Sequence, residues 1–324
     1  MDSRERFRQI MRYGSADRVP LFEEGIRAEV LEVWHTQGLP PHADLFSLFC
    51  FDRHEWIEPE LKPRPKPSVW PSSTSELDSF RQLLNPANAG RLPENWPDCV
   101  RLWQSRDYPL MLTVCDGLFL SLGVDGWRTF SDALHRLACE PQVALETMRI
   151  QGEFAARLAD RVLKEIEVDA AVFSEPLCDN HGPLVSPLMF EEFALKSYRP
   201  ILEVLHQNGV ETIIFMTWAN ARLILPAVMK YGFNCLWAFE ANTKAMNYYD
   251  LRREFGRELR LIGGIDLDKV REGEAAIRRE ILEKVPRLLA DGGYIPLADG
   301  RVREDVPYNN YVYYRRLLEE ITQS

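Results

Sequence analysis

Residues 211–216 read Glu-Thr-Ile-Ile-Phe-Met, a short apolar segment rich in β-branched side chains. Such a segment is typical of a buried strand. A helix is predicted next, from about Ala221 to Tyr231, and Gly232 would end it because glycine readily adopts the left-handed conformation found after helices. A strand followed by a helix and another strand is the repeating unit of a parallel sheet.

The same alternation continues on both sides of this segment. Further strands are predicted at 169–174, 234–239, 259–263 and 293–296, with helices over 187–208, before Gly256 and over 274–289. Ser186 suits the N-cap of the first of these helices, and Pro187 suits its first position. Pro200 should kink or split the same helix, because proline cannot donate a backbone hydrogen bond.

Three earlier strands are predicted at 19–22, 55–57 and 110–114, and with the five already named they make eight. No early Gly-x-Gly-x-x-Gly motif favours a dinucleotide-binding fold. Residues of about 80–107 are predicted to form an irregular insertion with short helices. We therefore expect an α/β protein whose residues 1–324 form a single (β/α)₈ TIM barrel with an irregular N-terminal insertion.

The amino-acid composition of the chain limits the kinds of molecule that it is expected to bind. The 324 residues carry a net charge of −10, which disfavours nucleic acid and an anionic membrane surface. No apolar run approaches the roughly 20 residues of a membrane span, and the charged start Met1–Arg6 lacks the apolar core of a signal peptide. The six cysteines are scattered without a Cys-x-x-Cys pair. These features predict a cytoplasmic protein that acts on a small molecule or a protein partner.

Several short motifs, taken together in their order and spacing, carry a family resemblance. They are Arg4-Glu5-Arg6-Phe7, Asp17-Arg18-Val19-Pro20, the run Gly182–Phe190, Gly263-Gly264-Ile265-Asp266 with Gly273, and Gly292-Gly293-Tyr294-Ile295 with Asp299, Pro307 and Asn309. The chain thereby resembles the uroporphyrinogen decarboxylase superfamily over nearly its whole length. The resemblance implies a barrel enzyme with its site at the carboxyl ends of the strands.

The sequence departs from the true decarboxylases of that superfamily. Their Arg-Gln-Ala-Gly-Arg-Tyr signature grips the substrate's carboxylates, whereas the matching stretch here is Phe22-Glu23-Glu24-Gly25-Ile26-Arg27. A pocket for a polycarboxylate needs several convergent cations, and an acidic pair would repel one. Only Arg27, Arg301 and Arg303 are candidates for such cations, so decarboxylation of uroporphyrinogen is disfavoured.

The sequence also departs from the zinc-binding, corrinoid-linked methyltransferases. In these the ligands are a His-x-Cys-Gly element and a later cysteine, but the matching positions here are Met216-Thr217-Trp218-Ala219 and Ala298-Asp299. These side chains cannot serve together as zinc ligands. We therefore expect no bound zinc and no thiol activated by a metal. The sequence still allows a metal ion bound by a different group of ligands, namely Glu175 with His181 or Glu240.

Three hypotheses about function remain. The first is a zinc-independent demethylating methyltransferase component, which moves a methyl group from a methoxylated or N-methylated small molecule to a corrinoid (cobalamin) on a partner protein. It predicts a funnel-shaped mouth wide enough for a cobalamin. The second is a lyase acting on a tetrapyrrole or smaller carboxylic acid, and the third is a non-catalytic binding subunit. Carboxyl groups with raised pKa values would count against the third.

The first hypothesis separates two kinds of methyl donor. An alkoxide or phenoxide that leaves from a methoxylated compound needs a proton. An amine that leaves from a quaternary ammonium group is neutral and needs none, so an aromatic wall around the cation would suffice.

Candidate site residues come from the expected carboxyl ends of the strands. Catalytic roles are predicted for His181, Glu175, Glu240 and Asp299. Substrate contacts are predicted for Glu24, Asp116, Asp179, Met216, Trp218, Asn220, Asp266 and Arg301.

Several of these candidates also have a structural interpretation. His181 and Asp179 are equally consistent with a hydrogen-bonded turn, and Asn220 with a helix N-cap. The pairs Gly263-Gly264 and Gly292-Gly293 fit either a phosphate site or tight turns.

Overall fold

The computed structural model describes residues 1–67 and 69–323, which form two compact units. Unit 1 comprises Met1–Glu55, Asp107–Pro109 and the chain from Cys235 on, and unit 2 comprises Trp56–Arg106 and Leu110–Asn234. The assignment of residues 1–324 to one domain stays a prediction.

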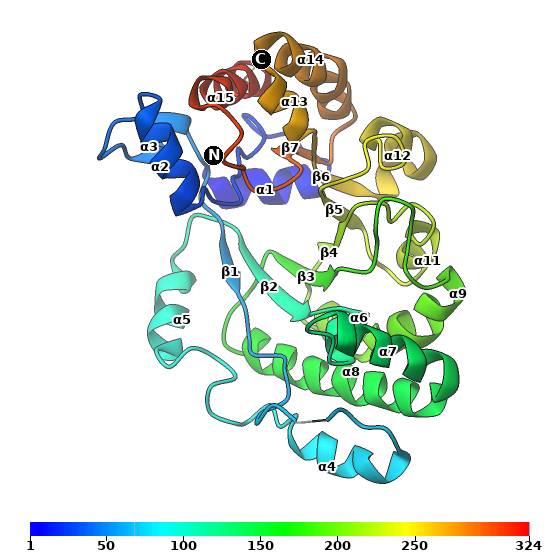
Figure 1. The fold of residues 1–324 in the computed structure, drawn as a ribbon. Helices are drawn as coiled ribbons and strands as arrows, with labels where there is room; N and C mark the ends of the chain where they lie inside the picture. The colour runs from blue at the N-terminus through cyan, green and yellow to red at the C-terminus, as the bar shows by residue number, and fades with distance from the viewer. Residues whose placement is uncertain (68, 324) are drawn as a thin grey trace. The chain divides into compact units, whose positions relative to one another are not determined.

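Unit 2 is built on three neighbouring parallel strands, β2 (Leu110–Cys115), β3 (Ala170–Glu175) and β4 (Ile213–Trp218) (Figure 1). In the register of these strands, Leu112 lies opposite Ala171, and Phe173 lies opposite Phe215. Most of their side chains are buried on both faces, as expected for a parallel sheet covered by helices.

The longest helix of unit 2, α8 (Pro141–Leu163), packs against β2 and against α10 (Lys196–Gln207). Gly152 permits the close contact of the two helices, because a Cβ there would lie 2.0 Å from the Ser197 carbonyl oxygen. The other helices of this unit are η1 (Thr74–Glu76), α4 (Leu77–Gln82), α5 (Trp96–Gln104), α6 (Leu118–Ser121), α7 (Trp127–Cys139), α9 (Pro187–Phe190), η2 (Glu191–Leu195) and α11 (Leu225–Lys230).

The helix predicted over 187–208 is split, as Pro200 suggested. Ser186 caps it, with its Oγ accepting a hydrogen bond from the Met189 N–H at 3.1 Å. After α9 the chain makes a wider π turn, η2, and then continues as α10 through Pro200. Since a proline ring crowds the carbonyl group four residues earlier, the wider turn upstream accommodates it.

Unit 1 contains three more parallel strands, β5 (Cys235–Phe239), β6 (Arg260–Ile265) and β7 (Tyr294–Ala298). α1 (Ser3–Met11) contacts β7, and α14 (Glu274–Asp291) packs on α15 (Tyr308–Thr322). The remaining helices are α2 (Ala28–Thr36), α3 (Leu45–Phe49), α12 (Tyr248–Phe255), η3 (Gly256–Glu258) and α13 (Leu267–Glu272).

The predicted strand at 19–22 was wrong. The backbone of this segment bonds mainly to side chains, and the Leu21 carbonyl oxygen also accepts the backbone N–H of Asp52 at 3.0 Å, which lies outside the described strands. The Leu21 N–H donates to Asp52 Oδ2 at 2.7 Å, and Arg315 donates to the carbonyl oxygens of Phe22 at 3.0 Å and Leu21 at 3.3 Å. The segment therefore satisfies its hydrogen bonds without joining a sheet.

The other predicted strands are confirmed, including the short β1 (Glu55–Ile57). β4 begins two residues later than predicted, and the helix before Gly232 is shorter because it begins only at Leu225. The described residues thus contain seven strands where eight were expected. The α/β class with parallel strands is as predicted, and the complete (β/α)₈ barrel stays a prediction. No helix in 1–67 and 69–323 combines the length and apolar character needed to cross a membrane.

Candidate active site

Glu175, the last residue of β3, is enclosed in unit 2 with 1 % of its surface exposed. Its Oε1 accepts a hydrogen bond from the Leu118 N–H at 2.9 Å, and its Oε2 accepts one from the Tyr198 hydroxyl at 2.6 Å. Burial raises the pKa of Glu175 to about 7, although both hydrogen bonds oppose the shift. Glu175 therefore holds a proton in a large share of molecules near neutral pH.

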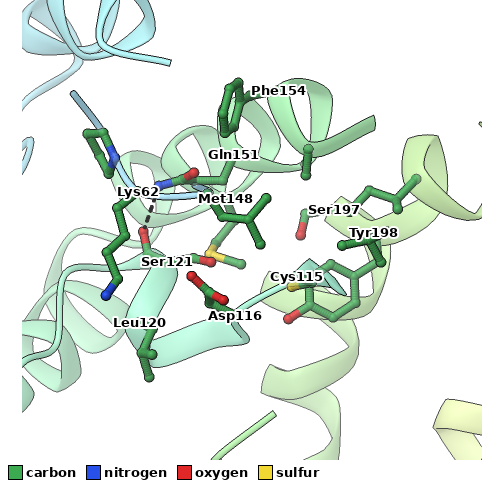
Figure 2. Close-up of a pocket in the computed structure, with 16 residues that line it drawn as sticks. Lys62, Cys115, Asp116, Leu120, Ser121, Met148, Gln151, Phe154, Ser197 and Tyr198 are labelled. Carbon is green, nitrogen blue, oxygen red and sulfur yellow. Dashed lines mark hydrogen bonds between the residues drawn. The ribbon is translucent and has the colours of Figure 1, made fainter. Parts of the chain in front are cut away.

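A small cavity is lined by Tyr198, which donates its hydroxyl to Glu175, and by Cys115 and Asp116 among others (Figure 2). The cavity has a volume of about 20 Å³, which leaves room for about one water molecule. The cavity is therefore too small for a substrate. Burial raises the pKa of Cys115 far above its usual range, so its thiol is not a nucleophile. Burial also raises the pKa of Asp116, and the charge of Lys62 opposes that shift.

The loops after β3 and β4 are joined through Asp179. Its Oδ1 accepts hydrogen bonds from the N–H groups of His181 at 2.7 Å and Gly182 at 3.1 Å, which is the geometry of a side-chain-closed turn. Its carbonyl oxygen accepts the Asn220 N–H at 3.1 Å. Asn220 in turn accepts the Arg222 N–H at 3.3 Å, so it closes a turn ahead of α11. The His181 side chain is exposed.

Met216 and Trp218 share one face of β4, because side chains alternate along a strand. Both are partly exposed, while the intervening Thr217 is buried and donates its hydroxyl to the Glu175 carbonyl oxygen at 3.1 Å. The strand therefore separates Thr217, which supports the buried carboxyl residue, from two side chains that are accessible.

In unit 1, the acidic pair Glu23 and Glu24 occupies two different environments. Glu23 accepts a hydrogen bond from the Tyr311 hydroxyl, and burial raises its pKa while the charge of Arg315 opposes the shift. Glu24 has a buried Oε1 with no hydrogen-bond partner among the described residues. Burial, followed by the charge of Glu23, raises the pKa of Glu24 to about 7, and the charge of Arg301 opposes the shift.

Asp299 follows β7 and is 8 % exposed. Its Oδ1 accepts the Leu267 N–H at 3.1 Å, and burial raises its pKa to about 6 in spite of that bond. Asp266 caps α13 by accepting the Asp268 N–H at 2.9 Å. Glu240 is exposed, and its N–H donates to the Asp299 carbonyl oxygen at 2.5 Å. Asp266 and Asp299 thus both hold the first turn of α13.

The family model described as uroporphyrinogen decarboxylase (URO-D) matches residues 122–296, more than half of the chain. The chain belongs to this family. No curated protein matches it. The family match begins after Glu24 and Asp116, and it includes Glu175, Glu240 and Asp266.

Two features of this family member bear on the polycarboxylate and metal alternatives. Arg27, Arg301 and Arg303 are exposed, and Arg303 forms ion pairs with Asp268 and Asp305. Among the described residues, no group of three His, Cys, Asp or Glu side chains could hold a metal ion, so Glu175 and His181 belong to no such group.

Sequence reasoning missed the residues that set these environments. Tyr198 lies 23 positions after Glu175 on a helix, and Tyr311 lies 288 positions after Glu23, so no local motif connects them. His54 was also missed. Its ring lies 4.6 Å from that of Phe22, and burial lowers its pKa to about 4, so its imidazole is neutral at neutral pH.

The two glycine pairs have a packing role. A Cβ at Gly264 would lie 2.6 Å from the Tyr248 ring, and one at Gly293 would lie 2.4 Å from the Tyr13 ring. Both positions have positive φ values, which only glycine adopts easily. The pairs therefore make room for tyrosine rings at these turns.

Proposed function

We propose that this member of the uroporphyrinogen decarboxylase family is a zinc-independent demethylating methyltransferase component. It takes a methyl group from a methoxylated or N-methylated small molecule and passes it to a corrinoid on a partner protein. The observation that carries the proposal is Glu24, a carboxyl group with a pKa of about 7 and a buried oxygen that no described residue bonds.

The chemistry follows from the leaving group of the methyl donor. When a methoxy C–O bond breaks, the oxygen keeps the electron pair and takes a proton from Glu24 as the methyl group departs to the corrinoid. A general acid works best when its pKa lies near the operating pH. Burial and the neighbouring Glu23 keep the proton on Glu24, and Arg301 favours its release. The corrinoid is a second substrate that accepts the methyl group.

The same charges disfavour the lyase alternative. A tetrapyrrole with several carboxylates needs convergent arginines, whereas Glu24 has another acid, Glu23, beside it. Arg315 is buried near Glu23, but its guanidinium donates to the backbone oxygens of Leu21 and Phe22. Raised pKa values at Glu24, Glu175 and Asp299 also favour an enzyme over a passive binding subunit.

The test is to mix purified protein with reduced cob(I)alamin and a panel of methoxylated and N-methylated compounds. Visible absorbance then follows the conversion of cob(I)alamin to methylcobalamin. Protein-dependent conversion with at least one donor is expected. If no donor is converted, even with free cobalamin at high concentration, the proposal fails, and a binding screen with tetrapyrroles then separates the lyase from the binding subunit.

A further inference from the structure

Three arginine side chains surround Tyr13 in unit 1. The guanidinium carbons of Arg257, Arg260 and Arg252 lie 4.5, 5.2 and 5.6 Å from the centroid of the Tyr13 ring. We call these four residues the Tyr13 cluster. Arg260 is the first residue of β6, and Gly293, which contacts Tyr13, directly precedes β7. The cluster therefore lies at the amino ends of these strands.

Backbone carbonyl groups hold the cluster in place. Arg252 donates to the Tyr13 hydroxyl at 2.8 Å, to the Gly256 carbonyl oxygen at 3.1 Å and to that of Gly293 at 3.2 Å. Arg260 Nε donates to the Met11 carbonyl oxygen at 2.8 Å. These bonds fix the positions of two guanidinium groups, but a neutral carbonyl group does not cancel their charge.

No carboxylate among residues 1–67 and 69–323 forms an ion pair with Arg252, Arg257 or Arg260, although the chain as a whole has a net charge of −10. Arg252 is 5 % exposed, and its Nε is buried without a hydrogen-bond acceptor. Arg257 is exposed and stacks on Tyr13 without a hydrogen-bond partner in the described part of the chain. Gathered positive charges repel each other, and a buried one is costly unless it is paired.

We propose that the Tyr13 cluster binds a phosphate-type oxyanion, either inorganic phosphate or the phosphoryl group of a small molecule. The guanidinium group of Arg257 and the terminal nitrogens of Arg260 provide planar donor pairs, which match phosphate oxygens. The charge of Arg252, whose guanidinium carbon lies 5.6 Å from the centroid of the same ring, adds to the attraction. Catalytic groups of parallel α/β barrels lie at the carboxyl ends of the strands, so a ligand here is separate from the methyl-transfer chemistry.

A bound anion should stabilise the folded protein, because a ligand that binds only the folded state shifts the unfolding equilibrium. The test measures thermal unfolding and calorimetric binding in a buffer free of oxyanions, with chloride added to constant ionic strength. Inorganic phosphate is one ligand and glycerol phosphate the other, which distinguishes the two sources of the phosphoryl group. A saturable rise in Tm is expected with one ligand or both.

Arg257→Gln is the deciding variant, since Arg257 makes no hydrogen bond that the fold would lose. It should weaken phosphate binding by about tenfold or more, the effect of losing a charge-assisted contact. In chloride alone its Tm should change little, because the loss of the contact between Arg257 and the Tyr13 ring is offset by the removal of one repulsive charge. Arg253→Gln, an exposed change on α12, is the matched control and should bind as the wild type does. The proposal is overturned if the wild type shows no saturable response or if both variants respond alike.

Discussion

Glu24 in unit 1 and Glu175 in unit 2 have the same pKa of about 7 for different reasons. Burial alone raises the pKa of Glu175, and hydrogen bonds from Leu118 and Tyr198 hold both of its oxygens. At Glu24 the charge of Glu23 adds to burial, and Oε1 has no partner among the described residues. Equal proton affinity therefore does not mean equal function, because Glu24 has a buried oxygen without a hydrogen-bond partner among the described residues, whereas both oxygens of Glu175 are bonded.

The largest expected effect is on turnover by Glu24→Gln. With methoxylated donors the rate of methyl transfer should fall roughly 10²- to 10⁴-fold, the usual contribution of a general acid. With quaternary ammonium donors it should change little, because their leaving amine needs no proton. The rate with methoxylated donors in the wild type should also decline as the pH rises above about 7, where Glu24 loses its proton.

The matched control is Glu29→Gln, an exposed carboxyl group on α2, which should leave both rates unchanged. An equal loss with both classes of donor in Glu24→Gln would show that Glu24 serves binding or folding and not proton transfer.

The next largest effect concerns the stability of Glu175 variants. Glu175→Ala leaves the Tyr198 hydroxyl and the Leu118 N–H buried without an acceptor, and should lower the free energy of unfolding by about 2–5 kcal/mol. Glu175→Gln keeps an acceptor oxygen and should cost about 1 kcal/mol or less. Urea unfolding measures both values. Similar costs for the two variants would mean that the hydrogen bonds do not account for the role of Glu175.

How far the sequence predicts these features depends on how local the determining contacts are. β3, β4 and β5 could be predicted because each is a short run of buried apolar residues, which is a local property. The segment 19–22 has the same local pattern, but Asp52 and Arg315 bond its backbone, and their positions depend on the tertiary fold. Residues 19–22 contain no sequence pattern that predicts these distant hydrogen-bond partners.

Contacts between residues far apart in the sequence also limit what could be predicted about the candidate site. The acidic pair Glu23 and Glu24 is visible in the sequence, and its carboxyl groups could be predicted to matter. Which of the two is bonded could not be predicted, because Tyr311 comes from the last helix. The Tyr13 cluster likewise gathers side chains from α12, η3 and β6 around a residue that follows α1.

A smaller effect is expected in the pH dependence of stability. The folded-state pKa values of Glu24 and Glu175 are raised from 4.5 to about 7, so between these values the folded protein binds more protons than the unfolded chain. Both groups therefore favour folding below about pH 4.5, and this contribution is lost as the pH rises towards about 7.

Glu175→Gln cannot titrate at this position, so its free energy of unfolding should fall less steeply with pH than that of the wild type. Chemical unfolding at a series of pH values measures the difference between the two proteins. If that difference is constant between about pH 4.5 and 7, the raised pKa of Glu175 is refuted.

The smallest expected effect comes from Tyr198→Phe. It removes the hydroxyl that donates to Glu175 Oε2 at 2.6 Å and should cost about 1 kcal/mol of stability. Because that hydrogen bond favours the ionised carboxylate, its loss should raise the pKa of Glu175 further. The pKa of Glu24 should not move, since Glu23 and Arg301 set it together with burial.

The measurement follows the infrared bands of the two carboxyl groups during a pH titration. The variants Glu24→Gln and Glu175→Gln assign each band to its residue, so that the two titrations are followed separately. A shift at both sites would show that the two carboxyl groups titrate as a coupled pair, and a shift at Glu175 alone would establish that each is set by its own neighbours.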